Sequence, residues 1–170
     1  MVETLPGGIP VTIEQIRKLI PHAGSMCLLE RVIECDDEKI VCETRSHLAP
    51  DNPLRHNGRV SSVCGIEYAA QAMALHGAIR RSGPAINGAE APNPGRSGSG
   101  HSQDAGGGRH GFLASVRDAH IERRYLDEVH NMLTVSAALE FDDASRVIYT
   151  FSLKADDIEL LSGRAAVVLT

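Results

Sequence analysis

The sequence predicts an α+β fold in which an antiparallel β-sheet wraps around one long central helix. From about Val60 to Arg81 the apolar residues cover most of the circumference of a helix, which is typical of a helix buried on several sides. Strand patterns stand on both sides of this helix in the chain, two before it and four after it. Such a lone buried helix indicates a sheet that packs around it.

The composition is that of one soluble domain. The chain has 170 residues, of which 42% are hydrophobic and 23% charged, and this is enough to bury a core. The net charge of −5 and the aromatic content of 4%, with no Trp, argue against a nucleic-acid-binding surface. The four cysteines form no Cys-x-x-Cys pair, so we expect no metal site.

Targeting signals are not evident in the sequence. The opening "MVETLPGGIPVT" has no basic segment followed by an apolar run, so we expect no signal peptide. No stretch approaches the roughly 20 apolar residues of a membrane span. We therefore expect a cytoplasmic protein without a membrane segment.

The segment before the central helix contains one short helix and two strands. "VTIEQIRKLIPH" has apolar residues at helical spacing, Thr12 and Gln15 have the spacing of a capping box, and Pro21 ends the run. "CLLERVIE" and "KIVCETRSH" are predicted as strands joined by a turn at "DDE". "LAPDNPLRHNG" is rich in Pro, Asn and Asp, so we expect an irregular loop.

The segment after the helix begins with an insertion and ends with four strands. Residues from about 82 to 110 are rich in Gly, Pro and Ser and predict a flexible insertion within the single domain 1–170. The strands that follow are "GFLASVRDAHI", "NMLTVSAALEF", "RVIYTFSLK" and "GRAAVVL". "DDAS" between the second and third of these is predicted as a hairpin turn.

Several segments resemble one enzyme family. "LIPHAGSMCLLERVIE" resembles the opening of the 3-hydroxyacyl-acyl-carrier-protein dehydratases of the FabA/FabZ type, in which a Pro-His pair precedes the first strand. "SHLAPDNPLRHNG" is similar to their active-site loop, and "IEYAAQAM" to their central helix. The resemblance covers nearly the whole chain outside 82–110. It is closest to the dehydratase-like branch found with aryl polyene pigment biosynthesis, and it implies the hotdog fold.

The resemblance implies a catalytic pair, His47 and Glu67. Dehydration of a 3-hydroxyacyl thioester needs a base for the proton beside the carbonyl and an acid for the departing hydroxyl. Imidazole has a pKa suited to the first task, and we expect His47 to be the base. Glu67 lies in an apolar helix, where burial is expected to raise its pKa and keep the proton that it must donate. No cofactor is needed.

Four further residues are expected to contribute to substrate binding. Gln71 stands one helical turn after Glu67 and is expected to orient it or the departing water. The segment from Gly58 to Ser62 is expected to present backbone N–H groups to the thioester carbonyl. Asn52 is expected to fix the loop that carries His47. His22, in the Pro-His turn, is interpreted as structural.

The resemblance also implies partners. His47 and Glu67 usually meet across a subunit boundary in this fold, which implies at least a homodimer or a heteromer with another hotdog subunit. The family's substrate arrives on an acidic acyl carrier protein. We expect basic side chains to receive it, and the candidates are Arg80, Arg81, Arg123, Arg124, Arg55 and Arg59.

Two other functions stay open. The first is a hotdog thioesterase, in which Glu67 activates water and His47 is dispensable. The second is a non-catalytic subunit that assembles with another dehydratase. The loop departs from the family pattern, because an inserted residue displaces the Pro after His47 and "HNGRVSS" replaces the Pro-Gly step before the helix. This departure keeps the second alternative open.

Overall fold

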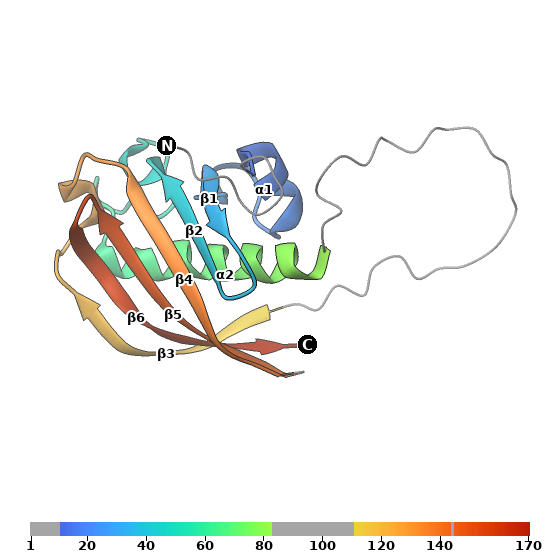
Figure 1. The fold of residues 1–170 in the computed structure, drawn as a ribbon. Helices are drawn as coiled ribbons and strands as arrows, with labels where there is room; N and C mark the ends of the chain where they lie inside the picture. Colours follow the sequence, from blue (N-terminus) through green and yellow to red (C-terminus); the bar gives the residue numbers. More distant parts are fainter. Residues whose placement is uncertain (1–10, 83–110, 144) are drawn as a thin grey trace, which may run out of the picture.

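A computed structural model describes residues 11–82, 111–143 and 145–170 of the chain. The long helix α2 (Gly65–Ser82) lies along one face of a six-stranded antiparallel sheet (Figure 1). The predicted architecture, a sheet around one central helix, is confirmed. The predicted insertion lies outside the described residues apart from its first residue.

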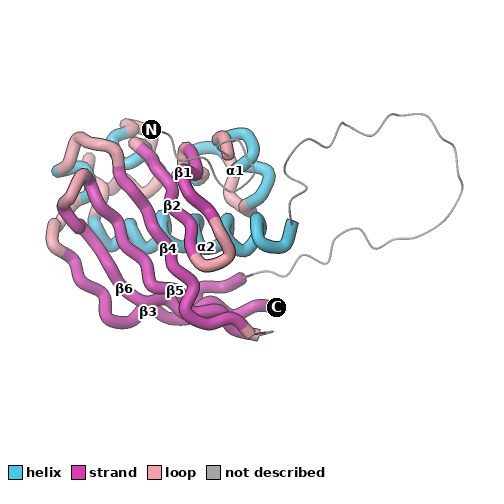
Figure 2. The backbone as a smooth tube through the Cα atoms, viewed as in Figure 1, coloured by secondary structure: helices cyan, strands magenta, loops and turns pink. Residues whose placement is uncertain are grey.

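The strands form the sheet in an order that differs from their order in the chain. They are β1 (Arg31–Cys35), β2 (Lys39–Thr44), β3 (Gly111–Ile121), β4 (Leu133–Asp142), β5 (Arg146–Ala155) and β6 (Ile158–Leu169). Their spatial order is β1-β2-β4-β5-β6-β3, and every neighbouring pair is antiparallel (Figure 2). The first strand after α2 thus forms an edge of the sheet, and β4 pairs with β2.

The core lies between α2 and the concave face of the sheet. On β5, alternate residues from Val147 to Leu153 are buried, as the period of two in the sequence predicts. On α2, Tyr68, Leu75, Ala69 and Ala72 have no exposed surface. The small alanines let the sheet approach the helix closely, and the polar outward side of each strand faces away from it.

The N-terminal helix packs beside the central one. Helix α1 (Ile13–Leu19) begins at a capping box in which the Thr12 N–H donates to Gln15 Oε1 at 2.8 Å. Ile16 and Ile20 are buried, and α1 contacts α2 (Figure 1). The chain then passes through a short 3₁₀ turn, η1 (Gly24–Met26), before it enters β1. The predicted capped helix that ends before Pro21 is confirmed.

The central helix begins later than the apolar pattern predicts. A 3₁₀ turn, η3 (Ser62–Cys64), precedes α2, and Val60 lies before this turn, outside any helix. A Cβ on Gly65 would lie 2.7 Å from Leu161 Cδ2 and 2.9 Å from Leu153 Cδ2. The first residue of the helix therefore packs so closely on the sheet that a side chain would force its neighbours to move.

A buried histidine ties the far end of α2 to the sheet. His76 has no exposed surface; its Nε2 lies 2.8 Å from the carbonyl oxygen of Asp36 and its Nδ1 lies 2.9 Å from the Tyr149 hydroxyl. A carbonyl only accepts, so Nε2–H donates to Asp36 and the Tyr149 hydroxyl donates to Nδ1. Burial lowers the pKa of His76 and raises that of Tyr149 to about 12, so both groups are neutral at pH 7.

We predict that His76→Leu lowers the free energy of unfolding by about 1–3 kcal/mol, because it leaves a buried hydroxyl and a buried carbonyl unpaired. The double variant His76→Leu/Tyr149→Phe should recover part of this loss, since it removes the stranded hydroxyl. Urea unfolding measures both effects, and His130→Leu, at an exposed position, is the control.

The contribution of His76 to the free energy of unfolding depends on pH, and the direction of this dependence follows from its lowered pKa. Since the pKa of His76 is lowered in the folded state, the unfolded state binds more protons below the ordinary histidine pKa of about 6.5. Stability should fall as the pH falls through that value, and less steeply in His76→Leu. Equal slopes in wild type and variant would contradict this assignment.

Candidate active site

The loop after β2 carries His47 into the interior. His47 lies in the 3₁₀ turn η2 (Ser46–Leu48), has no exposed surface, and its Nε2 is 3.1 Å from the carbonyl oxygen of Val129. Because that carbonyl only accepts, Nε2 carries the proton and Nδ1 keeps its lone pair. Burial lowers the pKa of His47, and the hydrogen bond to Val129 opposes this only in part. His47 is therefore a neutral imidazole at pH 7.

The free nitrogen of His47 is an exception among buried polar atoms. Nδ1 is buried and has no hydrogen-bond partner among the described residues. Buried polar atoms are nearly always paired, so an unpaired lone pair carries a cost that needs an explanation. A base that must accept a proton from a substrate requires such a lone pair.

Asn52 and Tyr68 hold the backbone next to His47. The Asn52 Nδ2 group donates to the Ser46 carbonyl at 2.7 Å and to the Tyr68 hydroxyl at 3.0 Å. The Tyr68 hydroxyl also lies 3.1 Å from Ser46 Oγ. The loop that carries His47 is thus tied to the first turn of α2 through a buried amide and a buried phenol.

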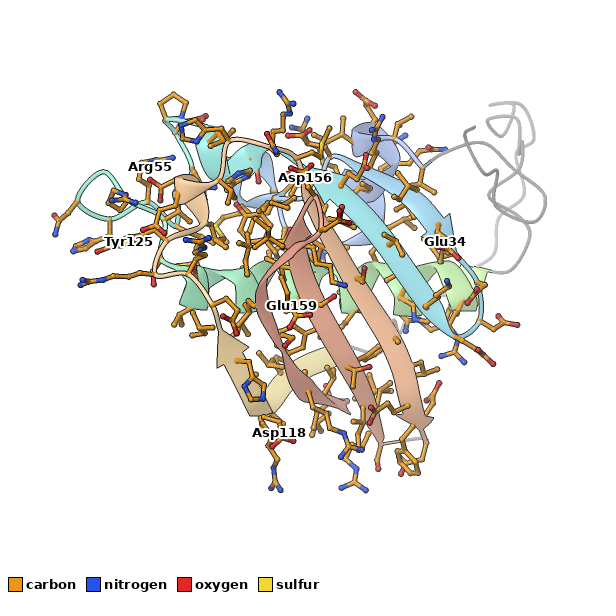
Figure 3. All side chains as sticks on the ribbon, turned by 60° about the vertical axis from the view of Figure 1, so that its left-hand side comes forward. Glu34, Arg55, Asp118, Tyr125, Asp156 and Glu159 are labelled. Atoms are coloured by element: carbon orange, nitrogen blue, oxygen red, sulfur yellow. The ribbon has the colours of Figure 1, made fainter. Side chains whose placement is uncertain are left out.

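A second anchor, which the sequence analysis missed, comes from Arg55 and Asp127. The Arg55 guanidinium donates to the carbonyls of His47 at 2.9 Å and Gly58 at 2.7 Å. Asp127 accepts 2.8 Å hydrogen bonds from the Arg59 guanidinium and from the Val60 N–H. Figure 3 shows Arg55 and Tyr125 at one end of the molecule and Glu34 at the other. We call the contacts of Arg55, Arg59 and Asp127 with this loop the loop clamp. The sequence gives no indication of it, because Asp127 is 67 residues from Val60.

The segment predicted to bind the thioester carbonyl is largely occupied by internal hydrogen bonds. The N–H groups of Arg59, Val60 and Ser62 donate to His56, Asp127 and Arg124 respectively. Asn57 and Gly58 have φ angles of 49° and 76°, so "HNGR" forms a tight turn with two left-handed residues. These three N–H groups are therefore engaged within the chain, and the role of the segment from Gly58 to Ser62 toward the thioester carbonyl stays a prediction.

The carboxylate of Glu67 is half-buried and held by two donors. Glu67 lies in the first turn of α2, and its side chain is 33% exposed. Its Oε1 lies 3.0 Å from Gln71 Nε2 and 3.0 Å from His22 Nε2. Gln71 is where the sequence predicted, beside Glu67. The contact from His22 was missed, because a structural role for the Pro-His turn gave no reason to expect it.

His47 and Glu67 do not contact each other within one chain. Among the described residues, the side chain of His47 bonds to Val129, and that of Glu67 bonds to His22 and Gln71. Tyr68, which follows Glu67 on the helix, contacts the loop of His47 instead. The structure therefore presents two half-sites on two sides of the start of α2.

The arginines predicted to dock a carrier protein do not form one surface. Arg80 and Arg81 end α2, and Arg80 forms an ion pair with Asp142 at 2.7 Å. Arg123 and Arg124 are exposed beside the start of the helix, where Ser62 N–H donates to the Arg124 carbonyl. At about 1.5 Å per residue, the two pairs are separated by roughly the length of the helix. Arg55 and Arg59 are engaged in hydrogen bonds within the loop, and docking of a carrier protein by any of these arginines stays a prediction.

The part of the chain that the structure describes contains no cluster of three or more His, Cys, Asp or Glu side chains arranged to hold a metal ion. None of its helices combines the length and the apolar character needed to span a bilayer.

Comparison with protein families identifies the segment that carries both half-sites. The family described as "ApeP-like: ApeP dehydratase" matches residues 14–92, which include His22, His47, Glu67 and Gln71. The resemblance to this dehydratase family is confirmed. No curated protein sequence matches the chain.

Solved structures confirm the hotdog fold. The dehydratase heterocomplex ApeI:P from Xenorhabdus doucetiae is similar with a TM-score of 0.69 and 19% identity, over 91% of this chain and 90% of that one. A mutant of thioesterase PA1618 from Pseudomonas aeruginosa has a TM-score of 0.57 and 13% identity, over 93% of both chains. An HP0420 homologue from Helicobacter felis has a TM-score of 0.58 and 8% identity, over 93% and 89%. At these identities the likeness establishes the fold alone.

We predict that Asp127→Asn lowers the free energy of unfolding by about 1–3 kcal/mol and exposes the Val60 amide to exchange. Val60 and Arg59 donate to different oxygens of Asp127, and the asparagine side chain has only one oxygen. Burial of Asp127 opposes its ionisation, but the Val60 N–H and the Arg59 guanidinium outweigh it and lower its pKa. This contribution is present at neutral pH and should be lost as the pH falls below about 4.

Hydrogen exchange and urea unfolding measure these effects. Asp37→Asn is the matched control, since Asp37 is exposed in the β1–β2 turn and has no recorded side-chain contact in the described structure. A Val60 amide that stays equally protected in Asp127→Asn would contradict the role of the clamp.

Proposed function

We propose that this protein dehydrates 3-hydroxyacyl thioesters on an acyl carrier protein to the trans-2-enoyl thioesters, in a fatty acid or aryl polyene type of synthesis. The observation that carries the proposal is the unpaired Nδ1 of a neutral His47 in the same domain as an oriented, half-exposed Glu67. The match to the ApeP-like dehydratases over residues 14–92 supports it.

His47 acts as the base. Its Nδ1 takes the proton from the carbon beside the thioester carbonyl, and the electrons of the broken C–H bond form the enolate. The Val129 carbonyl holds Nε2–H throughout and stabilises the imidazolium that results. Because the pKa of His47 is lowered by burial, the imidazole is unprotonated and available at neutral pH.

Glu67 acts as the acid. When the enolate collapses, the carbon–oxygen bond at the next carbon breaks, and the Glu67 proton joins the leaving hydroxyl to give water. The proton held by the His47 imidazolium then restores the protonated carboxyl through solvent. The half-exposed position of Glu67 gives the departing water a route out.

The two half-sites are completed by a second hotdog subunit, which is either another copy of this chain or a related chain. Strand β3 is an edge strand with an unpaired side, and its Phe112, Leu113 and Ile121 are 60%, 43% and 46% exposed. Such an edge is suited to pairing with another strand. Nδ1 of His47 has no access to solvent in the single chain, so the thioester reaches it only when an assembly or a movement of the loop opens a path.

Thioester hydrolysis is the alternative function. It is favoured by the exposed fraction of Glu67, which lets this carboxylate reach and activate a water molecule. In that reaction His47 has no task, and its unpaired Nδ1 stays unexplained. A non-catalytic subunit of a heteromer is the other alternative, and the similar ApeI:P structure is itself a heterocomplex.

We predict that the wild-type protein removes one water from a 3-hydroxyacyl carrier protein, and that His47→Ala and Glu67→Gln each lower the rate by about 10²–10⁴-fold, as expected for loss of a general base or acid. Mass spectrometry of the carrier-bound acyl group measures this directly. Release of free acid that persists in His47→Ala would instead establish a thioesterase. No turnover alone, with turnover after adding a second hotdog subunit, would establish the heteromer.

We predict a separate effect for the carrier-docking surface. Arg123 and Arg124 lie beside the start of α2, near the end of the helix that carries Glu67, so this pair is the docking candidate that we retain. Reversing both charges should raise KM about tenfold for the acidic carrier substrate and leave kcat unchanged. Turnover of the same acyl group on a short uncharged thioester is the control and should not change. An equal loss on both substrates would contradict docking.

A further inference from the structure

The arrangement of donors around Glu67 assigns a task to His22. We propose that His22 is a positioning residue, which holds Oε1 of Glu67 so that the acid presents its proton on Oε2 to the substrate. The proposal rests on the proposed function for the reaction in which Glu67 takes part. The contact itself is the 3.0 Å distance between His22 Nε2 and Glu67 Oε1.

The backbone on both sides of His22 is held in place by packing and hydrogen bonds. It follows α1, which is fixed by the buried Ile16 and Ile20, and it precedes η1, where Met26 N–H donates to the Ala23 carbonyl. The His22 side chain is 28% exposed, so its ring lies in the wall of the site rather than in solvent. A donor placed this way keeps one orientation before the substrate arrives.

Gln71 contributes the second donor, and the backbone fixes its orientation. The Leu28 N–H donates to Gln71 Oε1 at 2.9 Å, so the amide nitrogen must lie on the other side. There Nε2 donates to the Met26 carbonyl at 2.8 Å and to Glu67 Oε1 at 3.0 Å. Gln71 is fully buried, and its amide cannot turn without breaking all three hydrogen bonds.

Both donors reach the same oxygen of Glu67. With N–H groups from His22 and Gln71 on Oε1, both lone pairs of that oxygen are engaged, and a proton there would face two donors. Among the described residues no donor is recorded on Oε2. The carboxyl proton of the acid must therefore sit on Oε2.

His22 plays this part as a neutral donor. Its Nδ1 is buried and has no partner among the described residues, so a protonated imidazolium would bury an unpaired N–H. The neutral tautomer with the proton on Nε2 avoids this and still donates to Glu67. A hydrogen bond from a neutral donor orients the carboxyl group without imposing a permanent positive charge that would oppose its protonation.

The test compares His22→Ala, His22→Gln and His130→Ala in the complete protein. His22→Ala should lower kcat about tenfold to a hundredfold with KM within about threefold of wild type. The Glu67 carboxyl group is still present in this variant, but it is no longer held in one orientation. His22→Gln keeps an amide N–H near the position of Nε2 and should recover most of the rate. His130 is exposed and should have no effect when replaced. A rate unchanged in His22→Ala, or not recovered in His22→Gln, would overturn the proposal.

A spectroscopic measurement separates this proposal from the choice of reaction. In ¹⁵N-histidine-labelled protein, His22 should show a protonated Nε2 and a bare Nδ1, and Glu67→Gln should shift both resonances. If the protein hydrolyses thioesters instead, Glu67 remains the acting carboxylate. The rates of thioester hydrolysis by the same variants then test the role of His22. If the protein neither dehydrates nor hydrolyses the thioester, the proposed function fails. The ¹⁵N resonances of His22 then test by themselves whether His22 donates to Glu67. A proton on Nδ1 of His22, or ¹⁵N resonances of His22 that do not change in Glu67→Gln, would overturn the proposed role.

Discussion

The backbone N–H and carbonyl of Leu28 connect the two half-sites, and the geometry of both depends on this residue. Its N–H donates to Gln71, which orients Glu67, and its carbonyl accepts from Thr44 Oγ1 at 2.6 Å and Ser46 Oγ at 2.7 Å. Ser46 immediately precedes His47. One residue before β1 therefore fixes both the Gln71 amide beside Glu67 and the turn that carries His47. Breaking the bond to Gln71 would leave the Leu28 N–H buried and unpaired, and the two hydroxyls on the carbonyl tie the turn of His47 to the same residue.

The sequence predicted the elements of the fold more completely than their connections. Alternation at period two located β4 and β5, because it records which face of a strand is buried. It carried no information on which strands pair, and the position of β3 beside β6 follows from long-range contacts. The start of α2 was misplaced for the same reason. Val60 and Ser62 fit an apolar helical pattern, but their backbone groups bond to Leu126 and Arg124, which no local rule anticipates.

The candidate site shows the same division. His47, Glu67 and Gln71 were found because their residue types and order resemble a family, and the contact between Glu67 and Gln71 follows from helical spacing. Asp127 and His22 were missed, since each acts on residues more than forty positions away. An isolated aspartate and a histidine after Pro have no local signature in the sequence. Their roles emerge only once the fold places a carboxylate beside Val60 and an imidazole beside Glu67.

Two buried histidines, His47 and His76, differ in how many of their ring nitrogens are hydrogen-bonded. His76 and His47 are both fully buried with lowered pKa values, yet His76 pairs both ring nitrogens and His47 pairs one. The difference lies in their surroundings: His76 joins a helix to a sheet, where every bond adds stability, whereas His47 keeps a lone pair that contributes nothing to the fold. The open nitrogen supports the proposed use of His47 in proton transfer. In the proposed reaction the separation of that nitrogen from Glu67 within one chain makes the assembly of subunits part of the chemistry, because neither half-site has both groups.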